Sequence, residues 1–289
     1  MPSRPRRRLD DDVEPITRRR SRSTRLTGER DDAPVAYSTY RHPSTLRGPS
    51  PVPGWVPTDP DLLDEDLGVM KTGKEADVFL LRRGVPGTGR SCLLAAKRYR
   101  AADHRMFQRD SEYLDGRRVR ESRVNRAIAA RSAAGRAMIS TQWASAEFAA
   151  LSQLYAAGLP VPYPVQILQT ELLLEFIGEP DGTAAPRLAE TRPAGAELAS
   201  LWDQLVTALC GLARLGYTHG DLSAYNVLVH HGRLVLIDLP QAVDLVGNPQ
   251  GFAFLRRDCD NICSWFQARG VAADPQLLFD DLLLSVPGA

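Results

Sequence analysis

Three polar residues in the second half of the chain have the types and spacing needed for metal and phosphate chemistry. Asp221 lies in the run His-Gly-Asp-Leu-Ser-Ala-Tyr-Asn over residues 219–226, and Asp238 follows Asn226 by twelve residues. Two short apolar runs between them predict a hairpin that brings Asn226 and Asp238 side by side. A carboxylate and an amide oxygen are hard ligands suited to Mg²⁺ that also binds phosphates. Asp221 would then be free to accept a proton from a hydroxyl group.

Lysine is rare in this chain, which has 33 arginines and three lysines, all between residues 71 and 97. Lys97 ends an apolar run that predicts a strand, the place where a lysine pairs the α- and β-phosphates in protein kinases. Glu147, the only acid in a predicted helix over 137–157, is its expected partner. Lys74 lies in a turn with a single glycine, where a phosphate-covering loop belongs, whereas Lys71 receives no role.

The elements that position these residues follow from hydrophobic periodicity. Short apolar runs predict five strands, over 67–70, 76–81, 91–99, 165–169 and 171–177. The helix over 137–157 comes before the last two of them. After Gly178 the chain is mostly helical, with amphipathic segments at 194–216, 249–269 and 274–285. The expected fold class is α+β: a bilobal, protein-kinase-like fold with a five-stranded antiparallel N-lobe and a short, mostly helical C-lobe. A ligand is expected in the cleft between the lobes.

Composition divides the chain further. Residues 1–50 hold twelve arginines and seven acids, and the whole segment 1–57 is predicted to be a disordered Arg-rich tail. The N-lobe is assigned to residues 58–178, with a flexible Arg-rich loop at 101–136. The minimal C-lobe is assigned to residues 179–289.

Several classes of protein are excluded by composition. The net charge of +1 gives no global nucleic-acid signature. The four cysteines form no CxxC pair, which argues against a structural zinc site or a disulfide scaffold and favours a reducing, cytoplasmic location. No apolar run approaches the length of a membrane helix, so no membrane association is expected. His219 is expected to hold the catalytic loop, and His230-His231 to form an exposed turn that binds no metal.

Taken together, these motifs resemble the RIO family of atypical serine/threonine protein kinases, from about residue 66 to residue 266. The likeness is closest to the branch without an N-terminal winged helix, because residues 1–57 are too polar for that module. The loop 101–136 does not share this resemblance to the RIO family. The segments that carry the resemblance are Thr72-Gly73-Lys74-Glu75-Ala76, Ala95-x-Lys97, Trp143-x-x-x-Glu147-Phe148, Glu175-Phe176-Ile177-Gly178, the run 219–226, Ile237-Asp238-x-Pro240-Gln241 and Phe254-Leu255-Arg256-Arg257-Asp258-Cys259-x-Asn261.

The resemblance implies ATP and Mg²⁺ as cofactors and Asp221 as the catalytic base. Asn226 and Asp238 would hold the metal, and Asp238 would also take part in catalysis by accepting phosphate, which allows ATPase activity. The backbone around Glu175 and Ile177 would form the hinge that reads adenine. The full set of expected nucleotide-binding residues is Lys74, Ala95, Lys97, Glu147, Glu175, Ile177 and Ser223.

We therefore expect a kinase that transfers the γ-phosphate of ATP to serine, including serines of its own loop such as Ser111, Ser122 and Ser132. One alternative is a small-molecule phosphotransferase of the aminoglycoside or choline kinase type, which also carries His-Gly-Asp-Leu-x-x-x-Asn. Those enzymes generally add a larger helical substrate domain. The other alternative is an ATP-gated assembly factor associated with ribosomes or RNA, suggested by the Arg-rich tail and loop. The protein substrate remains unassigned.

Overall fold

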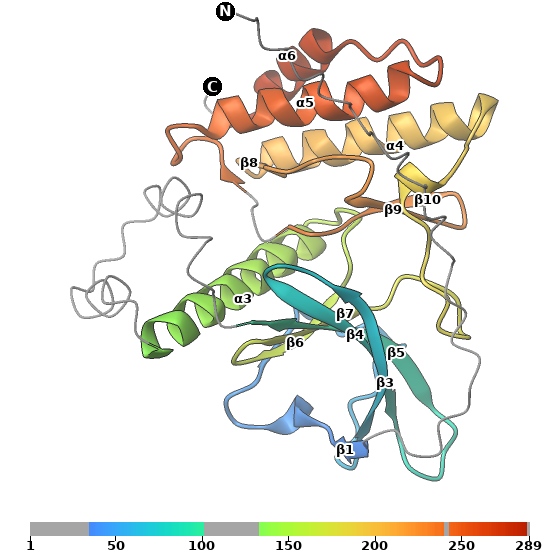
Figure 1. Ribbon diagram of the computed structural model, residues 1–289, viewed down its shortest axis with the longest axis vertical. Helices are drawn as coiled ribbons and strands as arrows, with labels where there is room; N and C mark the ends of the chain where they lie inside the picture. Colours follow the sequence, from blue (N-terminus) through green and yellow to red (C-terminus); the bar gives the residue numbers. More distant parts are fainter. Residues whose placement is uncertain (1–34, 101–132, 240–242, 288–289) are drawn as a thin grey trace, which may run out of the picture.

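The computed structural model describes residues 35–100, 133–239 and 243–287. One lobe contains a curled sheet with a single long helix, and the other contains three helices and two small antiparallel pairs (Figure 1). This is the expected α+β, two-lobed arrangement. In the described part of the chain, no helix is long and apolar enough to cross a membrane.

The sheet of the N-lobe has seven strands in the order β1-β3-β4-β5-β7-β6-β2, and every neighbouring pair is antiparallel. Five of these strands were expected, and the observed β5 has the predicted bounds. The sequence-based count of five was wrong because it lacked the two edge strands. The bounds are β1 (Val35–Tyr37), β2 (Leu46–Arg47), β3 (Leu63–Thr72), β4 (Ala76–Gly84), β5 (Ser91–Tyr99), β6 (Pro164–Leu168) and β7 (Glu171–Glu175).

Residues 35–57 are packed onto this sheet, whereas the sequence predicted them to be disordered. Strand β1 pairs with β3, and β2 pairs with β6. Between them, the short 3-10 helix Thr39–Arg41 buries Tyr40, and Val56 is buried in the same small core. The described structure therefore includes part of the segment assigned to the tail. The prediction for residues 1–34 lies outside the described residues.

Residues 35–57 are ordered because they help to cover a buried charged pair. Hydrophobic periodicity in the sequence gives no sign of such a pair. Arg83 of β4 is fully buried, and its guanidinium binds the Asp64 carboxylate through two hydrogen bonds of 2.7 and 2.8 Å. The ring of Tyr40 lies over that guanidinium, 5.5 Å from ring centroid to Cζ. The aromatic side chain shields the pair from water, which strengthens both the ion pair and the cation–π contact.

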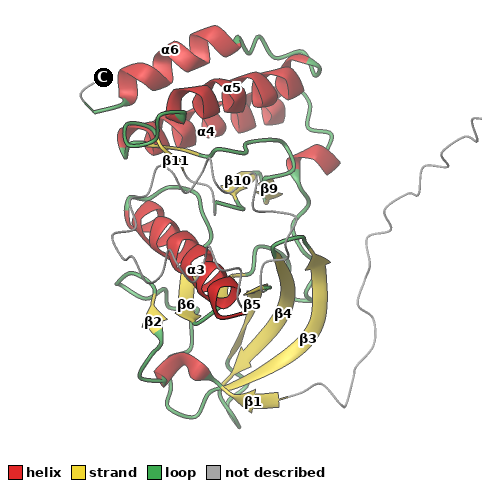
Figure 2. Ribbon diagram, turned by 60° about the vertical axis from the view of Figure 1, so that its left-hand side comes forward, coloured by secondary structure: helices red, strands yellow, loops and turns green. Residues whose placement is uncertain are grey.

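Helix α3 (Ala133–Ala156) packs against the sheet and lies on the side of the N-lobe nearer the other lobe (Figure 2). It begins before residue 137, so the expected loop 101–136 ends earlier than predicted, and the rest of that loop lies outside the described residues. Its buried positions repeat at helical spacing. Gly158, with φ of 80°, ends the helix because its N–H and that of Leu159 bond back to the carbonyls of Tyr155 and Leu154. The buried residues are Ser140, Ala144, Glu147, Phe148, Leu151 and Leu154.

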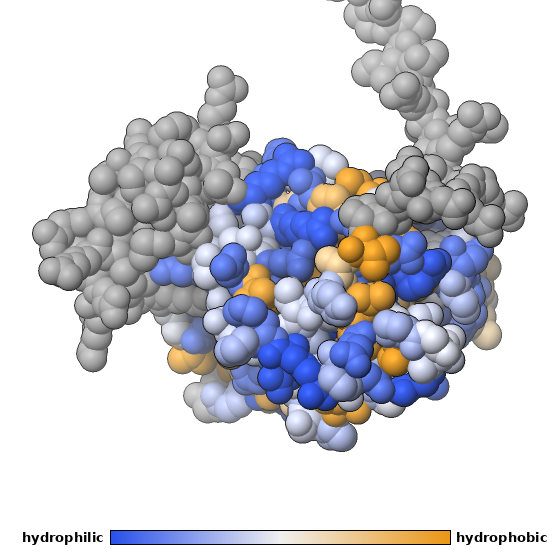
Figure 3. All heavy atoms as spheres, turned by 90° about the horizontal axis from the view of Figure 1, so that it is seen from below, coloured by the Kyte–Doolittle hydropathy of each residue, from blue (hydrophilic) through white to orange (hydrophobic). Residues whose placement is uncertain are grey.

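The C-lobe is built on three stacked helices, α4 (Gly195–Arg214), α5 (Gly251–Gln267) and α6 (Pro275–Ser285). The apolar stripe predicted for α4 is buried, and Trp202 beside it packs edge-on against Phe266 of α5. Between these helices and the sheet lie two small pairs, β9 (Val227–His230) with β10 (Arg233–Leu236), and β8 (Tyr217–Thr218) with β11 (Val243–Asp244). The end of the molecule seen in Figure 3 is mostly hydrophilic, with hydrophobic residues in small groups between polar ones.

Candidate active site

The loop between β8 and β9 carries Asp221, and a carboxylate from α5 fixes its shape. Asp258 is 2% exposed and accepts three hydrogen bonds, from the Thr218 hydroxyl at 2.8 Å and from the N–H groups of Gly220 at 2.7 Å and Leu222 at 2.8 Å. Gly220 adopts φ of 83°, which favours glycine. The loop is thus held on both sides of Asp221, whose side chain stays exposed.

Replacing Asp258 with asparagine is expected to loosen this loop. The new amide NH₂ would face N–H and O–H donors, leaving buried donors unsatisfied at a cost of about 1–3 kcal/mol. Thermal unfolding should shift to lower temperature, and the rate of ATP turnover should fall. Asp260→Asn, on the exposed side of the same helix, is the matched control. Equal melting temperatures and rates for the two variants would contradict the assigned role of Asp258.

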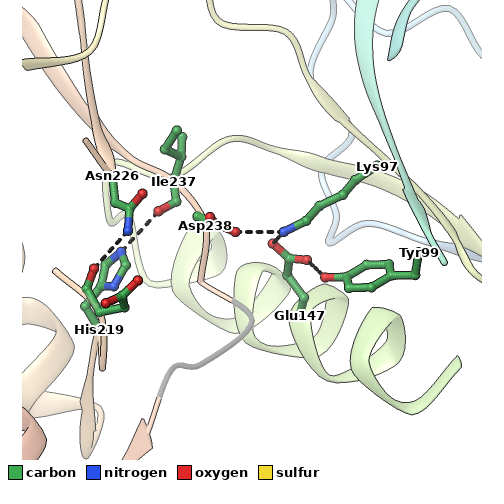
Figure 4. Close-up of polar contacts among 8 residues, drawn as sticks. Lys97, Tyr99, Glu147, His219, Asn226, Ile237 and Asp238 are labelled. Atoms are coloured by element: carbon green, nitrogen blue, oxygen red, sulfur yellow. Dashed lines mark hydrogen bonds and ion pairs between the residues drawn. The ribbon is translucent and has the colours of Figure 1, made fainter. Parts of the chain in front are cut away.

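His219 connects this loop to the segment that ends in Asp238. Its ring is fully buried, and its Nε2 lies 3.1 Å from the carbonyl oxygen of Ile237 (Figure 4). The side-chain nitrogen of Asn226 donates to the carbonyl of Asp221 at 2.8 Å, and the Ile237 N–H donates to the carbonyl of Asn226 at 3.0 Å. The hairpin therefore brings the two expected metal ligands together. Because its nitrogen is already bonded, Asn226 offers its side-chain oxygen to a metal.

Lys97 lies at the centre of a charged chain that joins the two lobes. Its Nζ is 2.8 Å from Oε1 of Glu147 and 3.0 Å from Oδ1 of Asp238 (Figure 4). Glu147 is 1% exposed, and its second oxygen accepts a hydrogen bond from the Tyr99 hydroxyl. The ion pair expected between Lys97 and Glu147 is present. The contact from Lys97 to Asp238 links strand β5 to the segment after β10.

The contacts around Lys97 hold Lys97, Asp238 and Tyr99 each in one protonation state. Burial lowers the pKa of Lys97, but the attraction of Glu147 and Asp238 outweighs it, so the pKa lies well above its ordinary value. Partial burial raises the pKa of Asp238, but the attraction of Lys97 leaves it below the usual range. Burial, and then the charge of Glu147, raise the pKa of Tyr99. Near neutral pH the site therefore contains an ammonium, an ionised Asp238 carboxylate and a protonated phenol.

Sequence reasoning did not assign two further cations, Lys71, which interacts with Asp238, and Arg187, which interacts with Lys71. Lys71 is in β3, and burial followed by repulsion from Arg187 lowers its pKa, while the attraction of Asp238 raises it. Arg187, in the C-lobe, donates to the carbonyl of Tyr225 in the loop that carries Asp221. The rarity of lysine was a signal for Lys71. Arg187 gave none, since it is one of many arginines.

The remaining predicted residues surround this centre less directly. Lys74 is exposed on the β3–β4 turn. Gly73 is needed there, because a Cβ would lie 2.7 Å from the carbonyl oxygen of Ala76. Ala95 lies in the middle of β5, opposite Leu80 and Leu174.

Three others lie at the end of β7, in the connection that follows it, and in the loop that carries Asp221. The Glu175 side chain accepts a hydrogen bond from the Tyr163 N–H at 3.0 Å, and burial raises its pKa. The carbonyl of Ile177 accepts from the Ala185 N–H at 2.9 Å, and the carbonyl of Ser223 accepts from the Asn226 N–H at 2.9 Å. The side chain of Glu175 is therefore engaged within the N-lobe.

Comparison with known proteins agrees with this geometry. The family model described as the RIO domain matches residues 88–278. The chain is 34% identical over 218 residues to the RIO-type serine/threonine-protein kinase Rio1 of Haloferax volcanii, covering 75% of this chain and 69% of that protein. It is 32% identical to the serine/threonine-protein kinase RIO1 of Chaetomium thermophilum, covering 73% and 41%. Identity to the serine/threonine-protein kinase RIO3 of Bos taurus is 30%, covering 73% and 40%. The matched region thus spans less than half the length of these two eukaryotic relatives.

Proposed function

The chain belongs to the RIO family of serine/threonine protein kinases, and on this basis we propose that it binds ATP with Mg²⁺ between its lobes and transfers the γ-phosphate to serine. The observation that carries the proposal is the chain of contacts Glu147–Lys97–Asp238, which lies beside the loop that presents Asp221. This arrangement combines a phosphate-binding cation, a metal-binding carboxylate and a proton acceptor, the parts that phosphoryl transfer requires.

The residues at the site fit a magnesium ion. Asn226 offers an amide oxygen, and Asp238 offers a carboxylate that is ionised and 42% exposed. Both are oxygen donors, the type that Mg²⁺ prefers. When bound, the ion would neutralise charge on the β- and γ-phosphates. On this proposal Lys97 binds the α- and β-phosphates, and Lys71 and Arg187 add positive charge from opposite lobes.

Asp221 acts as the base in this proposal. Its carboxylate is exposed on a loop whose backbone is fixed by Asp258, so it can accept the proton of a serine hydroxyl. The serine oxygen then bonds to the γ-phosphorus, and the bond from that phosphorus to the β–γ bridging oxygen breaks, releasing ADP. Nucleotide contacts from Lys74, Ala95, Ser223 and the backbone at Glu175 and Ile177 belong to the same proposal.

The test is incubation of the full chain with Mg²⁺ and ATP labelled in the γ-phosphate. We expect label on serine of the chain itself, stable to acid, together with slow release of labelled phosphate. A panel of amino alcohols and aminosugars tests the small-molecule alternative. The described residues after Gly178 form three main helices and no added substrate domain, which favours protein as the acceptor. Turnover of a small alcohol without labelled serine would contradict the proposal.

Asp238 can also take the phosphate itself, which would make the protein an ATPase. Its ionised oxygen would attack the γ-phosphorus, ADP would leave, and water would then hydrolyse the acyl phosphate. We expect wild-type protein to carry a label that hydroxylamine removes, and Asp238→Asn to carry none. The variant should also bind Mg²⁺-ATP about tenfold or more weakly, because one charged ligand is lost. A hydroxylamine-sensitive label that persists in Asp238→Asn would contradict this branch.

The suggested ribosomal or RNA partner and the cytoplasmic location remain proposals. The Arg-rich segments that motivate the partner, residues 1–34 and 101–132, lie outside the described residues. Binding of the full chain to ribosomal particles, compared with ATP and with ADP, tests whether the nucleotide controls such an association.

A further inference from the structure

The β9–β10 hairpin places two adjacent histidines at its tip. Its turn residues His231 and Gly232 have φ of 49° and 72°, the left-handed values of a two-residue type I′ turn. This turn brings the rings of His230 and His231 together, with their centroids 4.0 Å apart and their planes inclined by 42°. Glu179, just after the segment that joins the lobes, faces both rings. Its Oε1 lies 3.4 Å from Nε2 of each histidine.

These distances do not correspond to hydrogen bonds, which cluster near 2.9–3.0 Å for N–H···O, roughly. The Nε2 atom of His230 is buried and has no hydrogen-bond partner among the described residues. A buried polar atom of this kind requires a partner, because its desolvation is otherwise uncompensated. The three ligand atoms, one from each residue, all lie within 4.8 Å of one another.

The spacing suits a tetrahedral metal ion instead. Zinc bound at about 2.1 Å separates neighbouring tetrahedral ligands by about 3.4 Å, the spacing from Glu179 to both histidines. Two imidazoles and one carboxylate form a ligand set that zinc accepts, with the fourth position open to water or a further ligand. A harder ion such as Mg²⁺ prefers oxygen ligands, so it is less suited to this set.

We propose that Glu179, His230 and His231 form a zinc site, separate from the Mg²⁺ ligands at Asn226 and Asp238. The ion would join the segment after the lobe connection to the hairpin tip. Residues 178 and 184 close a short antiparallel bridge on that segment. Asn226 immediately precedes β9, and Asp238 follows β10 by two residues, so zinc would stabilise the hairpin on which both depend. On this proposal the hairpin tip is a metal site, whereas the sequence predicted an exposed turn that binds no metal.

The experiment titrates the chelator-treated full chain with Zn²⁺ by calorimetry and with Co²⁺ by visible absorption. Excess Mg²⁺ is present throughout, to occupy oxygen ligands at the active site. We expect one Zn²⁺ per chain, the absorption of tetrahedral Co²⁺, and a higher melting temperature with Zn²⁺. None of these three readouts depends on kinase activity, so failure here leaves the proposed function intact.

Two variants and a control make the test specific. His231→Asn removes one ligand while keeping a residue that tolerates positive φ, and Glu179→Gln removes the carboxylate charge. Each should weaken Zn²⁺ binding about tenfold or more and abolish the Co²⁺ band, since even outer partners of metal ligands affect affinity by this amount. His42→Gln, an exposed histidine elsewhere, should bind like wild type. Absent binding, or binding that both cluster variants leave unchanged, would overturn the proposal.

Discussion

Asp221→Asn is expected to lower the rate of phosphoryl transfer by about 10²–10⁴-fold, the usual contribution of a general base. Asparagine has nearly the same shape as aspartate but cannot accept the serine proton. The hydrogen bonds that fix the loop use backbone groups of Gly220 and Leu222, so the substitution leaves them in place. The affinity for ATP should therefore stay unchanged while the chemical step slows.

Single-turnover transfer of labelled phosphate measures the rate, and titration with a fluorescent nucleotide measures the affinity. Asp203→Asn, an exposed carboxylate on α4, is the matched control. If Asp221→Asn loses nucleotide binding and rate together, the residue supports the structure of the site. If it transfers phosphate as fast as wild type, the base must be another group.

The parts of the fold that the sequence predicted are those with strong local patterns. Strand β5 contains an unbroken apolar run, and α4 repeats its apolar residues at helical spacing. The bounds of both, and those of α3, were predicted to within a few residues. Strands β1 and β2 contain three and two residues, too few to show any period. Their stability depends on neighbours far along the chain, such as the pairing of Leu46 with Ile167.

The same distinction applies to the candidate site. Asp221, Asn226 and Asp238 lie close in sequence, so a local motif could predict that they come together. Lys97 and Glu147 are fifty residues apart, yet a strand end and an isolated helical acid still identified them. The contacts of Arg187 and Glu179 have no such local signal, because they depend on how the C-lobe segment between β7 and α4 folds back onto the loop that carries Asp221 and the β9–β10 hairpin.

The contacts of Lys97 also have an energetic consequence for the fold. Its side chain is 12% exposed and that of Glu147 is 1% exposed, so both charges are nearly removed from water. A buried ion pair contributes little net stability relative to apolar residues, but removing one partner leaves an uncompensated charge. The chain can therefore lose stability through the same lysine that the proposed function places on the phosphates.

Lys97→Met is expected to abolish measurable ATP turnover, with a loss of at least about 10²–10³-fold, and to destabilise the fold. The buried Glu147 carboxylate would lose its cation at a cost of about 3–5 kcal/mol, which lowers the melting temperature by about 10 °C. Lys97→Arg keeps the charge, but the larger, planar guanidinium cannot reproduce the point contacts to Glu147 and Asp238. The melting temperature of Lys97→Arg should lie nearer that of wild type, while its rate of ATP turnover stays low.

The double variant Lys97→Met/Glu147→Gln separates the two effects. Neutralising Glu147 removes the uncompensated charge and retains a side chain that can bond the Tyr99 hydroxyl, so most of the lost melting temperature should return. Turnover should not return, because no cation is restored at the phosphates. The mutant cycle contains wild type, Lys97→Met, Glu147→Gln and the double variant. Melting curves of these four proteins measure the change in stability, and their ATP turnover measures the loss of activity. Recovery of ATP turnover in the double variant would show that Lys97 supports only the fold. Full activity of Lys97→Arg would show that a positive charge of any shape suffices.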